Sequence, residues 1–264
     1  MEVIKIDIPK KLNLYILGDT HFPRGKIGKF KEAIDTIIKD RYGVMIGLGD
    51  WIESIVYGDP RYDPEEVGQM IKDAGGEINM INEQWDKFEE IIKPLAEQGK
   101  ILGLHQGNHE YQFTKRHSYN GLKALCKRID TRYLDYLPTV WRFKYKNNET
   151  KVMTLHGVGS GIAEGYEVRQ LDKHSRLFDD IELIAEGHTH KLTINNTSDR
   201  LKITDDNDLK QNIQWRCACG SFLGNYDIGR TSYSQRAMYR PLPLGYIKVE
   251  FIDGKINSVI AVPV

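Results

Sequence analysis

Ile101-Leu102-Gly103-Leu104 and, two residues later, Gly107-Asn108-His109-Glu110 form the part of this sequence around which the predicted fold is arranged. A short apolar run followed by glycine and polar side chains indicates a buried strand that ends in a loop. The Asn108 side chain can offer a metal ion its amide oxygen, and the His109 ring can exchange a proton. We therefore expect a strand whose carboxyl end carries functional groups.

Four other places in the chain repeat this order of an apolar run, a glycine and residues that can bind metal. The runs are 14–17, 44–48, 152–155 and 183–185, and the residues after them are Asp19 with His21, Asp50, His156, and His188 with His190. Because ligand sites of α/β proteins form where strands end, we expect five strands to direct their carboxyl ends at one point.

The first two of these strands are predicted to belong to one βαβ unit. Between them, apolar side chains recur at helical spacing, at Ile27, Phe30, Ile34, Ile37 and Ile38. A right-handed crossover places both strand ends on the same edge of a parallel sheet. Asp19, His21 and Asp50 are therefore expected to be neighbours.

Three more helices are expected downstream. Apolar residues recur at helical spacing in 85–95 and 122–129, and the segment 168–178 is also predicted to be helical. Pro94 is expected to kink or stop the first of these helices near its end.

Strand-like patterns occupy much of the second half of the chain. They predict a hairpin of 141–145 with 151–155, and strands at 213–219, 245–252 and 255–262. The very polar interval 195–212 is expected to be an exposed loop.

The segment from Tyr57 to about Gly76 breaks this pattern, because residues 58–64 (Gly-Asp-Pro-Arg-Tyr-Asp-Pro) have turn chemistry. We expect an insertion or lid at about 57–82, near the mouth of the site, within a single domain that spans 1–264.

Composition limits the classes of protein to consider. The 264 residues are 40% hydrophobic and 28% charged, enough to bury a substantial core. The mean hydropathy of −0.48 and the lack of an apolar run near ~20 residues argue against a membrane span. The opening residues do not resemble a secretion signal, so a cytoplasmic location is expected. The balance of 37 basic and 37 acidic residues disfavours a protein that binds long nucleic acid mainly through phosphates.

Several residues that could carry chemistry have simpler explanations. Cys126 is expected in the core, and strand alternation explains Cys217 and Cys219 better than a zinc site does. His105 lies within a strand run, and His174 is expected to be a surface or core histidine. None of these five residues is expected to bind metal.

Other polar residues could border the site. Arg116 and His117 follow the Asn108 segment closely and could meet an anionic substrate, although surface charge is the usual role of such residues. The glycine-rich segment 156–161 lacks the lysine of a P-loop, so its glycines are expected to make room for substrate. A basic cluster that could border the site comprises Arg230, Arg236 and Arg240.

The candidate ligands exceed what one tetrahedral zinc ion requires. They are Asp19, His21, Asp50, Asn108, His156, His188 and His190. Two carboxylates, one amide and four imidazoles suit two borderline divalent ions, for which we expect Mn²⁺, with Fe, Zn or Ni as alternatives. A shared carboxylate would hold the ions ~3.5–4 Å apart, the separation used for displacement at phosphorus.

The ordered motifs GDTH (18–21), GD (49–50), GNHE (107–110), HG (156–157) and GHTH (187–190) resemble those of the calcineurin-like metallophosphoesterases. The resemblance spans Asp19 to His190, about two thirds of the chain. It implies an α/β fold, namely a four-layer αββα sandwich of two mixed β-sheets, with a dinuclear metal site at the sheet edges.

The resemblance also implies roles for single residues. Asp19, His21 and His190 would hold the first metal ion. Asn108, His156 and His188 would hold the second, and Asp50 would bridge the two ions. His109 matches the non-ligand histidine of the family, which touches the substrate phosphate and assists the leaving group.

The implied activity is hydrolysis of a phosphate ester by a hydroxide that bridges the two ions. The second motif continues as Trp51-Ile52-Glu53-Ser54 and lacks the arginine of the protein phosphatases, which argues against that activity. We expect a phosphodiesterase acting on a nucleotide or nucleic-acid type of substrate, with no membrane partner. A phosphomonoesterase or pyrophosphohydrolase is the alternative, and a non-catalytic scaffold, such as the retromer subunit of this superfamily, is a third.

Overall fold

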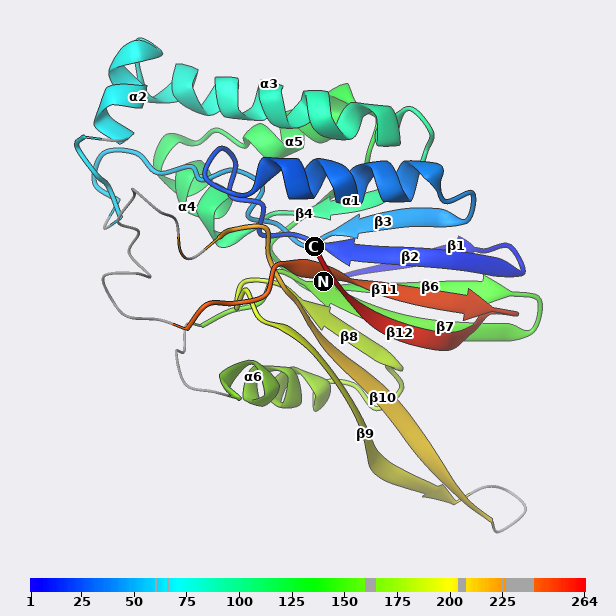
Figure 1. Cartoon of the computed structure of the whole chain (residues 1–264). Coiled ribbons are helices and arrows are strands. Elements are labelled where there is room, and N and C mark those ends of the chain that lie inside the picture. The colour runs from blue at the N-terminus through cyan, green and yellow to red at the C-terminus, as the bar shows by residue number, and fades with distance from the viewer. Residues whose placement is uncertain (60, 66, 160–164, 204–207, 225, 227–239) are drawn as a thin grey trace.

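The computed structural model describes residues 1–59, 61–65, 67–159, 165–203, 208–224, 226 and 240–264. Within this part of the chain, twelve strands form two mixed sheets of six strands each, accompanied by six helices. The sheets face each other and helices cover their outer faces (Figure 1). The expected α/β sandwich of two mixed sheets flanked by helices is confirmed.

One sheet has the strand order β12-β11-β2-β3-β4-β5. Its strands are β2 (Lys11–Leu17), β3 (Gly43–Gly47), β4 (Ile101–His105), β5 (Tyr133–Leu134), β11 (Gly245–Ile252) and β12 (Lys255–Pro263). The first four run parallel, so β2, β3 and β4 end at the same edge. The other two continue the sheet in antiparallel fashion beyond β2.

The other sheet has the order β1-β6-β7-β8-β10-β9. Its strands are β1 (Glu2–Asp7), β6 (Thr139–Tyr145), β7 (Asn148–Leu155), β8 (Leu183–Glu186), β9 (Leu192–Ile203) and β10 (Leu209–Cys219). The central pair, β7 and β8, runs parallel, and the predicted hairpin of β6 with β7 is present.

The helices form the two outer layers. They are α1 (Ile27–Lys39), α2 (Val67–Asp73), α3 (Glu77–Ala96), α4 (Asn108–His117), α5 (Gly121–Arg128) and α6 (Tyr166–Ser175). In Figure 1, α1, α3 and α5 lie over the sheet that contains β3 and β4, whereas α6 lies on the far side of the other sheet. Three apolar clusters fill the interfaces between successive layers. The buried face of α1, formed by Phe30, Ala33, Ile34 and Ile37, matches the predicted spacing. No helix among the described residues combines the length and apolar character needed to cross a bilayer.

The prediction of an exposed loop at 195–212 is wrong. The described residues of this interval other than Asp208 belong to β9 and β10, which pair in antiparallel fashion. Figure 1 shows the two strands projecting as a ribbon beyond the helical layers. Backbone hydrogen bonds hold the outer part of this ribbon together with little burial of side chains, and Ile203 and Leu209 are 70% and 62% exposed. A polar composition therefore did not indicate a loop here.

The segment after Asn108 is also not a loop, because helix α4 begins at Asn108 itself. Phe113 is the one apolar side chain that α4 buries, so hydrophobic periodicity gave no signal. The helix starts there because the Glu110 carboxylate accepts a hydrogen bond from the Gly107 backbone N–H at 2.8 Å.

The proposed insertion at 57–82 contains turns, α2 and the first residues of α3. Helix α3 continues past Pro94 and ends two residues later, which agrees with a proline near the helix end. A lid function for this segment stays a prediction.

Candidate metal centre

The predicted ligands lie where strands of both sheets end. Asp19 and His21 follow β2, Asp50 follows β3, and Asn108 begins α4 after β4. His156 follows β7, and His188 and His190 follow β8. Backbone hydrogen bonds join the first two loops, from Asp19 N to Gly49 O at 2.8 Å and from His21 N to Asp50 O at 3.0 Å. The structure thus brings all seven predicted ligands to one edge of the sandwich.

Five of these residues have a left-handed backbone conformation. Their φ angles are 51° for Asp19, 47° for His21, 51° for Asp50, 64° for His188 and 56° for His190. Residues other than glycine rarely adopt positive φ, and such residues concentrate at functional sites. The tight turns let consecutive short segments direct several side chains at one point.

Two motif glycines allow the loops to approach closely. A Cβ atom on Gly107 would lie 2.1 Å from Asp50 Oδ1, and one on Gly187 would lie 2.5 Å from Asp19 Oδ2. Any side chain at either position would displace a candidate ligand. Glycine is therefore needed at these two positions because the carboxylates of Asp50 and Asp19 leave no room for a Cβ atom.

The first cluster of ligand atoms comprises Asp19, His21 and His190. His190 Nε2 lies 3.2 Å from Asp19 Oδ1 and 3.0 Å from His21 Nε2. One donor atom from each residue lies within 4.8 Å of the others. Three converging oxygen and nitrogen donors could hold a divalent ion.

The second cluster comprises Asp50, His156 and His188, to which the Asn108 amide is added. Asn108 Oδ1 lies 2.9 Å from His156 Nε2 and 2.7 Å from His188 Nδ1. Asp50 Oδ2 lies 3.3 Å from His156 Nε2. These donors, like those of the first cluster, are the types that zinc and other borderline divalent ions bind.

Asp50 faces both clusters. Its Oδ2 atom lies 3.9 Å from His21 Nε2 in the first cluster, besides its contact with His156 in the second. Its other oxygen accepts a hydrogen bond from the His109 backbone N–H at 2.9 Å, which fixes the orientation of the carboxylate. The donor set therefore fits two ions that share one carboxylate.

The charges of the site favour cations. Burial alone would raise the pKa of Asp50, but the neighbouring His156, His109 and His21 hold it well below the usual value. For His156 burial alone would lower the pKa, but the attraction of the Asp50 carboxylate outweighs burial and raises the pKa of His156 to about 9. Buried carboxylates thus draw protons onto the imidazoles, and a divalent ion could replace those protons.

Sequence reasoning missed Glu53, which orients a ligand. Its Oε2 atom lies 2.9 Å from His21 Nδ1, so the other ring nitrogen of His21 is directed toward the first cluster. Burial would raise the pKa of Glu53, but the attraction of His21 prevails and lowers it to about 2. His156 is held in the same manner, by Leu48 O at 2.8 Å from its Nδ1. The sequence signal that could have identified Glu53 was its position, three residues after the candidate ligand Asp50.

Glu110 was likewise without a role in the sequence analysis. Its carboxylate accepts hydrogen bonds from the backbone N–H groups of Asp50, Trp51, Ile52 and Gly107. It therefore joins the loop after β3 to the first turn of α4, and with it Asp50 to Asn108.

His109 lies beside the clusters and contributes to neither of the two described above. Its Nδ1 lies 2.6 Å from the Glu53 carbonyl oxygen, so Nδ1–H is the donor and Nε2 carries the lone pair. Nε2 lies 3.8 Å from Asp50 Oδ2 and also contacts the Arg61 guanidinium. Burial is the main reason that the pKa of His109 falls to about 4, with Asp50 opposing the shift.

The two predicted substrate contacts lie at the other end of α4. Arg116 Nη1 is 3.7 Å from Asp59 Oδ2, and His117 Nε2 is 3.8 Å from Glu77 Oε2. At ~1.5 Å per helical residue they lie roughly 12 Å along the axis from Asn108. The structure does not bring them to the metal-type residues, and their substrate role stays a prediction. Of the predicted basic cluster, Arg230 and Arg236 lie outside the described residues, as do Ser160 and Gly161 of the glycine-rich segment.

The residues expected to be structural have partners within the fold. His105 lies 3.0 Å from Asp135 O through Nδ1 and 2.9 Å from Thr154 Oγ1 through Nε2. His174 Nδ1 lies 2.8 Å from Glu186 Oε2. Cys126, Cys217 and Cys219 are buried free thiols.

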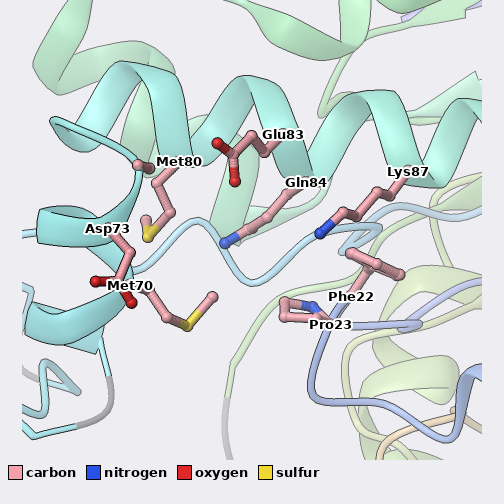
Figure 2. Close-up of a pocket in the computed structure, with 9 residues that line it drawn as sticks. Phe22, Pro23, Met70, Asp73, Met80, Glu83, Gln84 and Lys87 are labelled. Carbon is pink, nitrogen blue, oxygen red and sulfur yellow. The ribbon is translucent and has the colours of Figure 1, made fainter.

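A separate cavity of about 210 Å³ lies between α2, α3 and the Phe22–Pro23 turn (Figure 2). Met70, Met80 and Phe22 form much of its apolar lining, and Gln84 points into it from α3. None of the residues that line this cavity belongs to either ligand cluster, so it is distinct from the candidate metal centre.

No protein-family model and no curated protein matches this chain. Many solved structures match it, among them three distant ones that match most of the chain. A conserved uncharacterised protein of Streptococcus pneumoniae, described as a predicted phosphoesterase, is 13% identical, with 96% of this chain and 90% of that chain covered and a TM-score of 0.41. Vps29 of Entamoeba histolytica in complex with Zn²⁺ is 15% identical, with 96% and 98% covered and a TM-score of 0.43. GAP50 of Plasmodium, described as the anchor in the inner membrane complex, is 10% identical, with 97% and 90% covered and a TM-score of 0.46.

Proposed function

We propose that this protein is a phosphoesterase that requires two divalent metal ions and favours phosphodiester substrates of nucleotide or nucleic-acid type. The observation that supports this most strongly is the position of Asp50, whose carboxylate faces two separate sets of metal-type donors. A carboxylate shared between two such sets can hold two ions at the separation used for two-metal hydrolysis at phosphorus.

Seven side chains would hold the ions. Asp19, His21 and His190 would bind the first, and Asn108, His156 and His188 the second, with Asp50 common to both. When bound, the ions would supply Lewis acidity and would make water a strong nucleophile near neutral pH. Mn²⁺ is the ion that we expect, with Fe, Zn or Ni as alternatives.

His109 would handle the proton of the leaving group. Its Nδ1–H donates to the Glu53 carbonyl oxygen, which fixes the ring and leaves Nε2 on the side of Asp50. A histidine held in this way can orient the departing oxygen and, once Nε2 is protonated, can donate that proton to it. Glu53 and Glu110 would act through the residues that they position, His21 and Asp50.

The test compares hydrolysis of bis-p-nitrophenyl phosphate and p-nitrophenyl phosphate in Mn²⁺, before and after chelation. We expect faster cleavage of the diester and loss of turnover on chelation. Asp50→Asn should abolish turnover, because it removes the shared charge. Asp253→Asn is the matched control, since Asp253 has the same φ of 51° but lies at the β11–β12 turn, next to the strand ends opposite the site.

The outcomes separate the three candidate functions. Preference for the monoester would support a phosphomonoesterase or pyrophosphohydrolase in place of the diesterase. No turnover of either ester with Mn²⁺, Fe²⁺, Zn²⁺ or Ni²⁺ would contradict a phosphoesterase that accepts these general substrates and would favour a scaffold.

A further inference from the structure

Arg61 is held in a fixed orientation by Asp59, two residues before it in the segment between β3 and α2. Asp59 accepts hydrogen bonds from Arg61 Nε at 2.9 Å and from Nη2 at 3.0 Å, and also from the Arg61 backbone N–H at 2.9 Å. This is a bidentate pair, the arrangement that gives an arginine both strength and direction. Asp59 is itself buried, so the anchor is part of the protein interior.

The third guanidinium nitrogen points at the candidate active site. Arg61 Nη1, the nitrogen that Asp59 does not contact, touches His109 Nε2 and lies 3.4 Å from His109 Nδ1. The Arg61 side chain is 39% exposed, whereas His109 is buried. The guanidinium therefore lies between bulk solvent and the buried histidine.

Two arginines gather on the solvent side of His109. Asp59 faces both of them, since Arg116 Nη1 from α4 lies 3.7 Å from the same carboxylate. One carboxylate thus lies between two guanidinium groups, and the carboxylates of Glu53 and Asp50 attract Arg61 from the side of the candidate metal centre. Guanidinium remains protonated at any pH at which the protein is folded.

We propose that Arg61 binds an anionic oxygen of the substrate phosphate beside His109 and that Asp59 positions it for this contact. The inference rests on the proposed phosphoesterase function and adds a substrate-binding residue to it. Once a phosphate oxygen takes the Nη1 contact, His109 Nε2 is released to face the leaving oxygen. A guanidinium can keep its bidentate pair with Asp59 and still offer Nη1 to a phosphate oxygen, which the single ammonium group of a lysine cannot do.

The first measurement is the affinity of inorganic phosphate, a reaction product, for the Mn²⁺-loaded protein by titration calorimetry. Arg61→Ala should weaken binding by about 10- to 100-fold, the effect of losing a hydrogen bond to a charged group. The affinity of Arg61→Lys should lie between those of the wild type and Arg61→Ala, because lysine keeps the charge but loses the bidentate pair with Asp59. KM for bis-p-nitrophenyl phosphate should rise in the same order, while bound Mn²⁺ per chain stays unchanged.

Arg142→Ala is the matched control. Arg142 forms an equivalent bidentate pair with Glu149, at 2.9 and 2.8 Å, and its side chain is 33% exposed. It lies in the β6–β7 hairpin, away from the strand ends that carry the ligands. Phosphate affinity of this variant should equal that of the wild type.

A double-mutant cycle tests the role of Asp59. Asp59→Asn should weaken phosphate binding in the wild type, because Arg61 loses its anchor, and should have no further effect in Arg61→Ala. An equal effect of Asp59→Asn in both backgrounds would show that Asp59 acts through the fold and not through Arg61.

Different results would contradict the role of Arg61 and the phosphoesterase function. Arg61→Ala and Arg61→Lys proteins that turn over the diester and bind phosphate as the wild type does would overturn the role of Arg61 alone. A wild-type protein that neither hydrolyses phosphate esters nor binds phosphate would overturn both.

Discussion

Among the eight histidines, the surroundings of each ring, and not the residue type, separate ligands from core residues. His105 has a protein partner on both ring nitrogens, Asp135 O and Thr154 Oγ1. His21 and His156 each have a partner on Nδ1, and their Nε2 atoms face a ligand cluster. The sequence could rank these residues only by the glycines next to them.

His105 should make stability depend on pH in mildly acidic solution. Burial lowers the pKa of His105 to about 4, below the value of about 6.5 for an exposed histidine. The unfolded chain therefore binds the proton more readily, so the contribution to stability is complete above pH 6.5. It is lost as pH falls toward 4, and amounts to about 2 kcal/mol between pH 7 and pH 5.

Urea unfolding at pH 7 and pH 5, with chelator present, measures this contribution. His105→Gln should lose about 2 kcal/mol less than the wild type over that interval, whatever its stability at pH 7. Identical pH dependence of the two proteins would contradict a neutral, buried His105.

At the scale of elements, the first turn of α4 joins two ligand loops. Glu110 accepts hydrogen bonds from four backbone N–H groups, three of them in the loop after β3 and one at Gly107. The motif glutamate is thereby explained by the connection of Asp50 to Asn108 and not by contact with a metal ion.

Glu110→Gln should therefore destabilise the protein. The glutamine side chain replaces one acceptor oxygen with an NH₂ group, which would face backbone donors in a buried place. We expect a loss of about 1–3 kcal/mol in the free energy of unfolding, measured by urea denaturation.

Glu32→Gln on α1 is the control for this variant, because Glu32 is 65% exposed and pairs with Lys29 at the surface. Its effect should stay below about 0.5 kcal/mol. A similarly small effect of Glu110→Gln would show that these hydrogen bonds contribute little.

At the scale of the whole molecule, the candidate site joins the two sheets. β2, β3 and β4 of one sheet and β7 and β8 of the other all end next to candidate ligands. Metal ions bound there would favour the folded state, because the donors come together only in that state.

Mn²⁺ should consequently raise the melting temperature in a concentration-dependent manner. At a free concentration of 100 Kd the stabilisation is about 3 kcal/mol per site, or roughly 5–10 °C for a chain of this size. Calorimetry with Mn²⁺ and with chelator checks this, and Asp50→Asn should show a much smaller shift. A melting temperature that is the same in Mn²⁺ and in chelator would contradict the metal centre.

Part of the fold could be predicted because burial leaves a pattern in the sequence. The spacing in α1, the hairpin of β6 with β7, and the apolar runs that become β2, β3, β4, β7 and β8 all follow from side chains that face the core. α4 buries one apolar side chain and the described residues of 195–212 bury little, so these two stretches carried no such pattern. They are held by backbone hydrogen bonds, which any sequence can make.

The same distinction applies to the site. The pattern of an apolar run with an adjacent glycine identified the candidate ligands, because ligand sites form where the strands of an α/β sheet end. They are Asp19, His21, Asp50, Asn108, His156, His188 and His190. Three other contacts join residues that are distant in the chain. They are the contact of Glu53 with His21, that of Glu110 with the loop after β3, and that of Arg61 with His109. Those contacts depend on how loops pack across the edge of two sheets, and only the tertiary structure determines that packing.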